Sequence, residues 1–146
     1  MSAGMLPDLM LSMQRVIGLG AKHRLDATYS TALMEHYSKR GCLVIDMDHQ
    51  IEPVISAMPM LTSADMLNYI RMELLRSLVF QVSQVDKPVV FLNLRIGAEM
   101  TFVQDVLGNS TFFHLLTNES DQIDNEFDIP FLDVTQLHGH VLDSLL

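Results

Sequence analysis

The sequence predicts one mainly helical domain over residues 1–146, with one or two short strands as a minor component. Three observations support this prediction. The chain is 49% hydrophobic, which is enough for a buried core and excludes a wholly disordered protein. A long helical pattern spans residues 64–85. A short, partly β-branched run between turn signals spans residues 42–47 and predicts a strand.

The helix predicted near 64–85 is the clearest element. Thr62 or Ser63 caps its start, and Asp65 lies in its first turn. One apolar face recurs at helical spacing and consists of Leu67, Ile70, Leu74, Leu78 and Val82. Because further apolar residues widen this face, we expect the helix to lie centrally in the domain or against a second subunit.

Weaker patterns extend the helical prediction along the chain. Three more segments have helical spacing or helix start and stop signals: residues 6–20, 26–41 and 131–146. Gly139 weakens the last of these by about 1 kcal/mol relative to alanine. Residues 87–94 are a second strand or an extended lead-in, since Pro88 prevents a continuous helix from the preceding segment. Residues 117–130 predict an acidic loop.

The net charge of −9 originates in the last third of the chain. Residues 1–95 contain nine Lys or Arg and nine Asp or Glu, whereas residues 96–146 contain nine acidic residues and no cation. Such a region repels phosphate, so we expect little direct nucleic-acid contact and a partner protein that is basic or binds DNA itself. An acidic face that serves only solubility is an equal alternative.

The sequence also predicts where the protein resides. Cys42 is the single cysteine, which excludes an internal disulfide and fits a reducing compartment. No apolar run reaches the roughly 20 residues needed to cross a bilayer. The N-terminal residues lack the cationic start of a signal peptide. We therefore predict a cytoplasmic protein without membrane contact.

The segment from Arg95 to Leu116 has the outline of a helix-turn-helix, with a turn at Gly108. A helix that reads DNA needs polar side chains for the bases and cations for the phosphates. The expected second helix is instead apolar at Phe112 and Phe113, and no cation follows Arg95. We interpret the segment as a packing element.

The acidic and histidine residues suggest two kinds of chemistry, metal binding and proton transfer. Asp46, Asp48 and His49 stand close together, and paired carboxylates can hold Mg²⁺ or transfer protons. However, the sequence has no phosphate-binding glycine-rich loop, no nucleophile elbow and no zinc-ligand spacing, and His138 and His140 lack a third ligand. The favoured prediction is therefore a non-enzymatic protein with no catalytic residue, cofactor or metal. We expect Asp48 to lie in a turn after the strand.

Two stretches resemble the FlhD-like subunits of bacterial transcriptional activators, which include flagellar master regulators and mobile-element relatives. They are "GCLVIDMDHQIEPVI" (41–55) and "LRIGAEMTFVQDVLGNSTFF" (94–113). The resemblance implies a mainly helical subunit in a hetero-oligomer, whose FlhC-like partner carries most of the DNA contact and any zinc. The basic residues expected after Gly108 are missing, which argues against DNA contact by this chain.

Three functions follow in order of preference. The first is a regulatory subunit of an FlhD-like activator that acts through protein contacts and oligomerises. The second is a small acidic secretion chaperone or adaptor that binds a segment of a client protein. The third is an enzyme that uses Asp46, Asp48 and His49 and has a pocket and a divalent metal. The predicted partner interface consists of Leu67, Ile70, Leu74, Leu78, Val82, Val44, Phe112 and Phe113.

Overall fold

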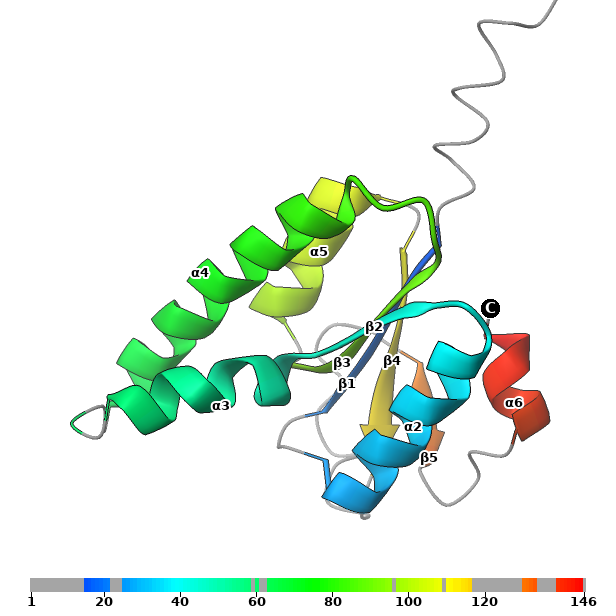
Figure 1. The fold of residues 1–146 in the computed structure, drawn as a ribbon, viewed down its shortest axis with the longest axis horizontal. Coiled ribbons are helices and arrows are strands. Elements are labelled where there is room, and N and C mark those ends of the chain that lie inside the picture. The colour runs from blue at the N-terminus through cyan, green and yellow to red at the C-terminus, as the bar shows by residue number, and fades with distance from the viewer. Residues whose placement is uncertain are drawn as a thin grey trace, which may run out of the picture.

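In the computed structural model, five parallel strands form one sheet in the order β2-β3-β1-β4-β5 (Figure 1). The structure describes residues 15–21, 25–58, 60, 63–95, 97–108, 110–116, 130–133 and 139–145. The strands are β1 (Val16–Ala21), β2 (Leu43–Asp46), β3 (Val89–Arg95), β4 (Ser110–Leu116) and β5 (Phe131–Asp133). The helices are α2 (Ala27–Lys39), α3 (Met47–Ala57), α4 (Ala64–Val82), α5 (Ala98–Leu107) and α6 (Gly139–Ser144).

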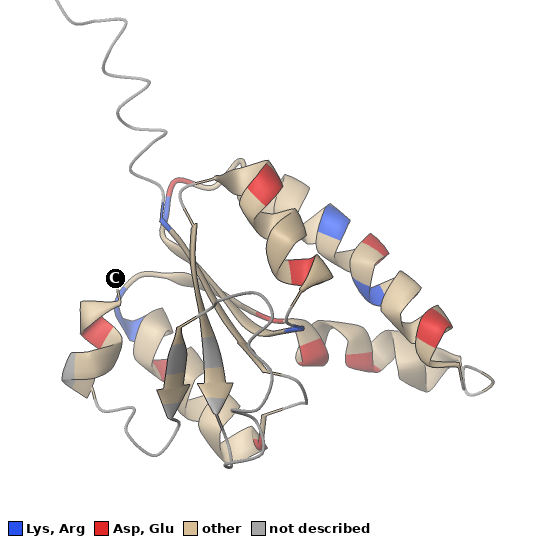
Figure 2. Cartoon of the chain, turned by 180° about the vertical axis from the view of Figure 1, so that it is seen from behind, with Lys and Arg blue, Asp and Glu red and all other residues tan. Residues whose placement is uncertain are grey.

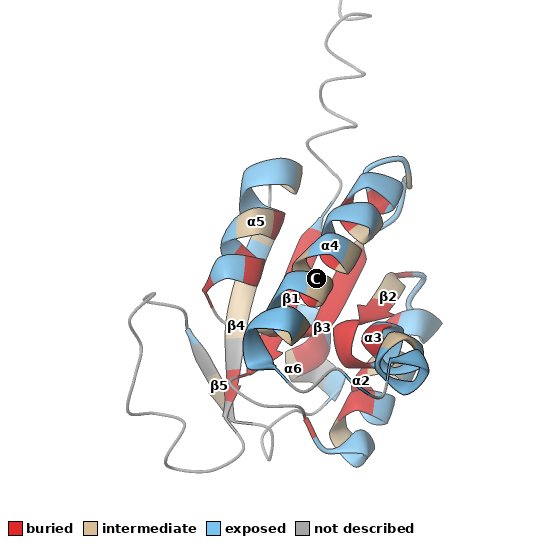
Figure 3. Ribbon diagram, turned by 90° about the vertical axis from the view of Figure 1, so that its left-hand side faces the viewer, coloured by how far each residue is buried: buried red, intermediate tan, exposed pale blue. Residues whose placement is uncertain are grey.

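Helices cover both faces of the sheet. One apolar cluster joins alternate residues of β1 and β3 to α2 and α6, through side chains that include Leu33 and Leu142. The other cluster joins the remaining residues of the same strands to α3, α4 and α5, through side chains that include Leu75 and Val103. Figure 3 shows β1 and β3 buried between these layers. The fold is therefore a three-layer α/β architecture.

Two glycines in β1 allow close approach by neighbouring strands and by α5. A Cβ on Gly18 would overlap the ring of Phe112, and a Cβ on Gly20 would lie 2.5 Å from the carbonyl oxygen of Leu94 and overlap Met100. These glycines therefore lie inside a strand, where they permit close packing.

The predicted mainly helical fold is wrong. Three of the strands lie where helices were expected: β1 occupies the end of the segment 6–20, β4 occupies the second half of the helix-turn-helix outline, and β5 occupies the start of the segment 131–146. Strands β1 and β4 are mainly apolar on successive residues. Strands covered on both faces lack the alternation of apolar and polar residues that identifies a half-exposed strand.

Several local predictions are confirmed. Helix α2 begins after Asp26, whose side chain accepts a hydrogen bond from the backbone N–H of Thr28. Helix α4 covers most of the predicted 64–85 range, and Ser63 caps it. The strand predicted at 42–47 is β2, and the strand alternative for 87–94 is β3. The predictions for residues 6–14 and for the acidic loop 117–129 lie outside the described residues.

The C-terminal segment differs from its prediction as well. Instead of one helix over 131–146, the chain forms the short strand β5 and then α6, which begins at Gly139. Among the described residues, no helix is long and apolar enough to cross a membrane. Figure 2 shows both acidic and basic residues along α4, whereas the charged residues of α5 are all acidic.

Candidate functional site

The candidate site lies where β2 and β3 end at their carboxyl edge. Strand β3 is adjacent to β1 in the sheet, but the helices that follow these two strands, α5 and α2, pack on opposite faces. Such a change of direction leaves a crevice at the carboxyl ends of the strands, where open α/β sheets bind their ligands.

Asp46 and Asp48 begin the site. Asp46 is the last residue of β2 and caps α3, because its Oδ1 accepts the backbone N–H of Asp48 at 3.1 Å and of His49 at 3.4 Å. Asp48 lies in the first turn of α3, where a carboxylate is favoured by the helix dipole. Both aspartates are more than nine-tenths buried. The predicted turn at Asp48 is therefore a helix start.

Arg71 of α4 joins the carboxylates of two other elements. Its Nη1 lies 2.6 Å from Asp48 Oδ1, and its Nε lies 2.8 Å from Glu99 Oε2 in α5. Arg95, at the end of β3, also contacts Asp48 Oδ1, at 2.9 Å. Arg71, Asp48 and Glu99 are all buried. Two cations and two anions thus neutralise one another in a network that ties α3, α4, α5 and β3 together.

One oxygen of Asp48 remains without a partner. Both arginines bind Oδ1, whereas Oδ2 is buried and accepts no hydrogen bond within the described part of the chain. An unsatisfied buried carboxylate oxygen costs roughly 1–3 kcal/mol, and a ligand group or an ordered water that bonds it removes this cost. Asp48 is therefore the strongest candidate for direct contact with a ligand.

A cleft of about 440 Å³ opens beside Asp48, between α3 and α4. Its polar lining includes Asp48, Arg71, Arg95, Asn68 and Glu52. Apolar side chains of both helices complete the walls: Ile51, Ile55 and Leu67. The combination of two guanidinium groups with carboxylate and amide oxygens suits a small ligand that has both negative charge and hydroxyl groups.

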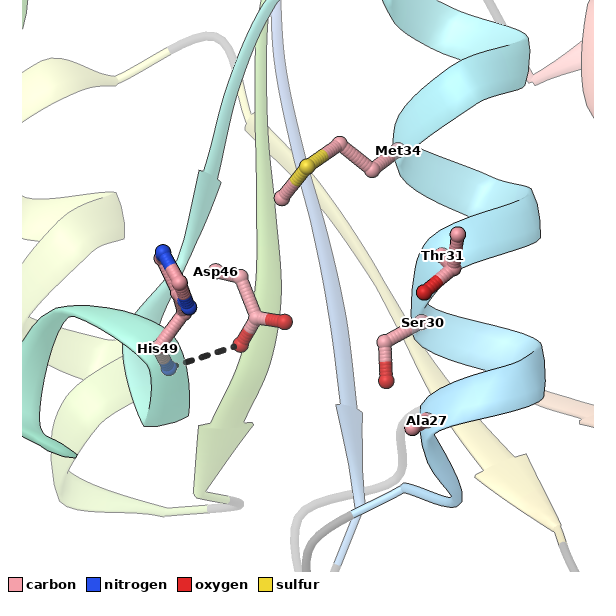
Figure 4. Close-up of a pocket in the computed structure, with 6 residues that line it drawn as sticks. All are labelled: Ala27, Ser30, Thr31, Met34, Asp46 and His49. Carbon is pink, nitrogen blue, oxygen red and sulfur yellow. Dashed lines mark hydrogen bonds between the residues drawn. The ribbon is translucent and has the colours of Figure 1, made fainter.

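A second, smaller cavity of about 240 Å³ lies between α2 and the start of α3 (Figure 4). Asp46 and His49 line one side, and Ser30, Thr31 and Met34 of α2 line the other. The second carboxylate oxygen of Asp46 points toward α2 across this cavity (Figure 4). Asp46 and Asp48 therefore serve different cavities and do not share one strand face, as two residues of a strand would.

The connection from β1 to α2 occupies the position where a phosphate-binding loop precedes its helix in other proteins. In this chain the connection reads "GLGAKHRLDA" (18–27), which lacks the Gly-Lys-Ser/Thr ending of such loops. Gly18 and Gly20 belong to β1, and residues 22–24 lie outside the described part. The first turn of α2 is capped by Asp26, and this hydrogen bond to a backbone N–H lowers the pKa of Asp26.

The predicted interface residues do not form one exposed surface. Those of α4 are half-buried or buried, and the residues of α4 that point most deeply inward are Arg71, Leu75, Val79 and Val82. Val44 and Phe113 pack against one core cluster, and Phe112 packs against the other. Whether any of them contacts a partner stays a prediction.

The remaining candidates carry less chemistry. Cys42 is buried, and burial raises the pKa of its thiol, which fits a structural role. His138 lies outside the described residues. Within the described part of the chain, no three His, Cys, Asp or Glu side chains are close enough to hold a metal ion.

Sequence reasoning missed Arg71, Asn93 and Glu99. Arg71 stood in the printed sequence four residues before Leu75, at the spacing of one helix face. A cation on an apolar helix face was the available signal, because a buried arginine requires carboxylate partners. Nothing local marked Asn93 or Glu99.

Comparison with solved structures gives the fold an independent reference. The chain is similar to a gluconokinase from Sinorhizobium meliloti 1021, with a TM-score of 0.59 and 14% sequence identity over 90% of this chain and 89% of that chain. No family model matches the sequence. No curated protein matches it either.

This likeness corrects the functional predictions. The FlhD-like resemblance implied a mainly helical subunit, whereas the chain has a parallel α/β fold that it shares with a gluconokinase. The assignment to a transcription activator is therefore wrong. The preference for a non-enzymatic protein was tied to that helical fold and is corrected with it, since the observed fold is one that the chain shares with a gluconokinase. The predicted partner protein remains untested.

Proposed function

We propose that this chain is a small-molecule kinase whose acceptor substrate is an anionic, polyhydroxylated compound bound in the cleft between α3 and α4. The single observation that carries the proposal is the unpartnered, buried Oδ2 of Asp48 beside this cleft. The likeness to a gluconokinase supports sugar acids as the substrate class.

The cleft supplies the two contacts that a sugar acid requires. Asp48 Oδ2 accepts a hydrogen bond from a substrate hydroxyl, while the two arginines on Oδ1 hold the carboxylate in place. The side chain of Arg95 is 28% exposed and lines the cleft, so its guanidinium group pairs with the substrate carboxylate. In phosphoryl transfer, the hydroxyl oxygen attacks the terminal phosphorus of a nucleoside triphosphate, Asp48 accepts its proton, and the diphosphate leaves.

The donor side of the proposed site departs from other phosphate-binding loops. The β1–α2 connection lacks the Gly-Lys-Ser/Thr ending. Its cations are Lys22 and Arg24. The carboxylate of Asp26 already caps the first turn of α2 and opposes an incoming phosphate there. We therefore expect acceptor binding to be stronger evidence for the proposal than nucleotide affinity.

Titration calorimetry with D-gluconate tests acceptor binding directly, and D-glucose serves as the ligand control because it lacks the carboxylate. We expect Asp48→Asn and Arg95→Gln each to weaken gluconate binding about tenfold or more, since each removes a charge-assisted hydrogen bond. Arg76→Gln is the control for Arg95→Gln, because Arg76 is an exposed arginine outside the lining of the cleft. Equal affinity for gluconate and glucose, or no binding of either, overturns the proposed acceptor class.

Phosphoryl transfer is tested by incubating the protein with gluconate and Mg²⁺·ATP and following a phosphorylated sugar acid by mass spectrometry. Asp48→Asn is expected to abolish product formation while circular dichroism shows an intact fold. Product formed at the wild-type rate by Asp48→Asn refutes the role of Asp48 as proton acceptor.

A further inference from the structure

The backbone at Asn93 is unusual in two ways. In the ladder between β1 and β3, Leu19 pairs with Leu92 and the next residue, Gly20, pairs with Leu94, so Asn93 is left out as a bulge. Its φ is +61°, a value that a non-glycine residue rarely adopts, and it is 1% exposed. Bulges beside functional sites redirect a side chain or a carbonyl, and local strain is maintained only where the surroundings enforce it.

The side chain of Asn93 bonds two segments that lie tens of residues away from it in the sequence. Its Oδ1 accepts the backbone N–H of Leu25 at 3.0 Å, immediately before α2. Its Nδ2 donates to Asp46 Oδ1 at 2.8 Å. The start of α2 and the cap of α3 are therefore held to the end of β3 by one amide group.

The carbonyl group of the same residue holds the two arginines of the site. It accepts hydrogen bonds from Arg71 Nη2 at 2.8 Å and from Arg95 Nη1 at 3.1 Å. These are the side chains that fix Asp48 through its Oδ1. A regular strand at this position would turn the carbonyl toward the ladder, so the bulge is what directs it to the arginines.

We infer that Asn93 is a positioning residue, whose side chain orients Asp48 through the cap residue Asp46 and keeps the start of α2 in register with the cap of α3. Its carbonyl group holds Arg71 and Arg95 in addition. This inference rests on the proposed function, because it concerns the same cleft. Asn93 itself does not line the cleft, so its effect on a ligand passes through the residues that it holds.

Two substitutions test the side chain of Asn93 and keep its backbone carbonyl in place. Asn93→Gly adopts a positive φ without strain but removes both side-chain hydrogen bonds. Asn93→Asp retains the size of the side chain but replaces the donor to Asp46 by a second carboxylate, which repels it. Arg76→Gln remains the control for an unrelated surface change.

We expect the gluconate dissociation constant to rise about tenfold in Asn93→Gly, because Asp46, whose Oδ1 accepts the backbone N–H of Asp48, loses the amide group that holds it. The melting temperature falls as well, because two buried hydrogen bonds are lost. For Asn93→Asp we expect a larger rise at neutral pH that diminishes as the pH falls and one carboxylate takes up a proton. Wild-type gluconate affinity in Asn93→Gly, with only a change in stability, overturns the inference.

Amide hydrogen exchange provides a readout that needs no ligand. We expect Asn93→Gly to accelerate exchange at the amides of Leu25 and Asp48, one bound by Asn93 and the other by its partner Asp46. Unchanged exchange at both amides refutes the bridging role. If the wild-type protein binds no gluconate, the proposed function fails, and this exchange measurement still decides the role of Asn93.

Discussion

Replacing Arg71 by methionine is the most informative single perturbation of this structure. Arg71 is 3% exposed and donates four hydrogen bonds, two to Glu99, one to Asp48 and one to the carbonyl of Asn93. Methionine retains the apolar stem of the side chain but lacks the guanidinium group and donates nothing. The change therefore leaves two buried carboxylates with fewer partners.

Removing one partner of a buried ion pair costs about 3–5 kcal/mol, because the other charge stays buried. The lower end applies here, since Arg95 retains contact with Asp48 through its side chain and with Glu99 through its backbone N–H. We therefore expect a loss of about 3 kcal/mol in the free energy of unfolding. With a urea slope of about 1.5 kcal/mol/M, the unfolding midpoint falls by about 2 M.

Urea denaturation followed by circular dichroism measures this loss. Arg76→Met is the matched control on α4, because Arg76 is exposed and makes only a 3.9 Å ion pair with Glu73 and a contact with the ring of Phe102, and we expect a loss of at most about 1 kcal/mol. Adding Glu99→Gln to Arg71→Met removes one uncompensated charge and is expected to recover about 1 kcal/mol. A loss below 1 kcal/mol in Arg71→Met would refute the reasoning.

Three further predictions concern other parts of the fold. Gly20→Ala should lower stability by about 1–3 kcal/mol in urea titrations, because the added methyl group meets a backbone carbonyl of β3 at 2.5 Å, and an unchanged midpoint would contradict this contact. Tyr37→Phe should lose about 1 kcal/mol, since the buried hydroxyl donates to the carbonyl of Leu142 at 3.0 Å, and measurable loss of α6 protection in hydrogen exchange should accompany it. The pKa of Asp143 lies below its ordinary value of 3.8 because Arg40 donates hydrogen bonds to it, so its contribution to stability is present above that value and is lost as the pH falls through the lower, folded-state pKa. The stability difference between wild type and Asp143→Asn should therefore shrink in acid, and a difference that is constant from pH 6 to pH 2 would exclude this linkage.

The accuracy of the sequence predictions followed the range of the interactions involved. Helices α2 and α4 were predicted with their caps, because Asp26 and Ser63 bond to amides two or three residues away. Strands β1 and β4 were missed, because each is defined by pairing with a strand far along the chain and is apolar on both faces. The most buried stripe of α4 was not identified from the sequence, because further apolar residues widen the apolar face of this helix.

The candidate site was anticipated in part. The sequence itself placed Asp46, Asp48 and His49 together, and the enzyme hypothesis built on them expected a pocket. The structure places a cavity beside each aspartate, but the described residues include no cluster of metal ligands. The preference for a protein-binding role came from charge and apolar patterns, which describe a surface and not a site.

By itself the sequence determined the capped helices, the short strand predicted at 42–47 and the uneven distribution of charge. Only the tertiary structure decided that the strands form a parallel sheet, that Arg71 lies between Asp48 and Glu99, and that Asn93 is bulged out of β3. The physical reason is sequence separation. Helix caps and helical spacing depend on neighbouring residues. These contacts, in contrast, join side chains that are more than twenty residues apart, and they form only when the layers have packed.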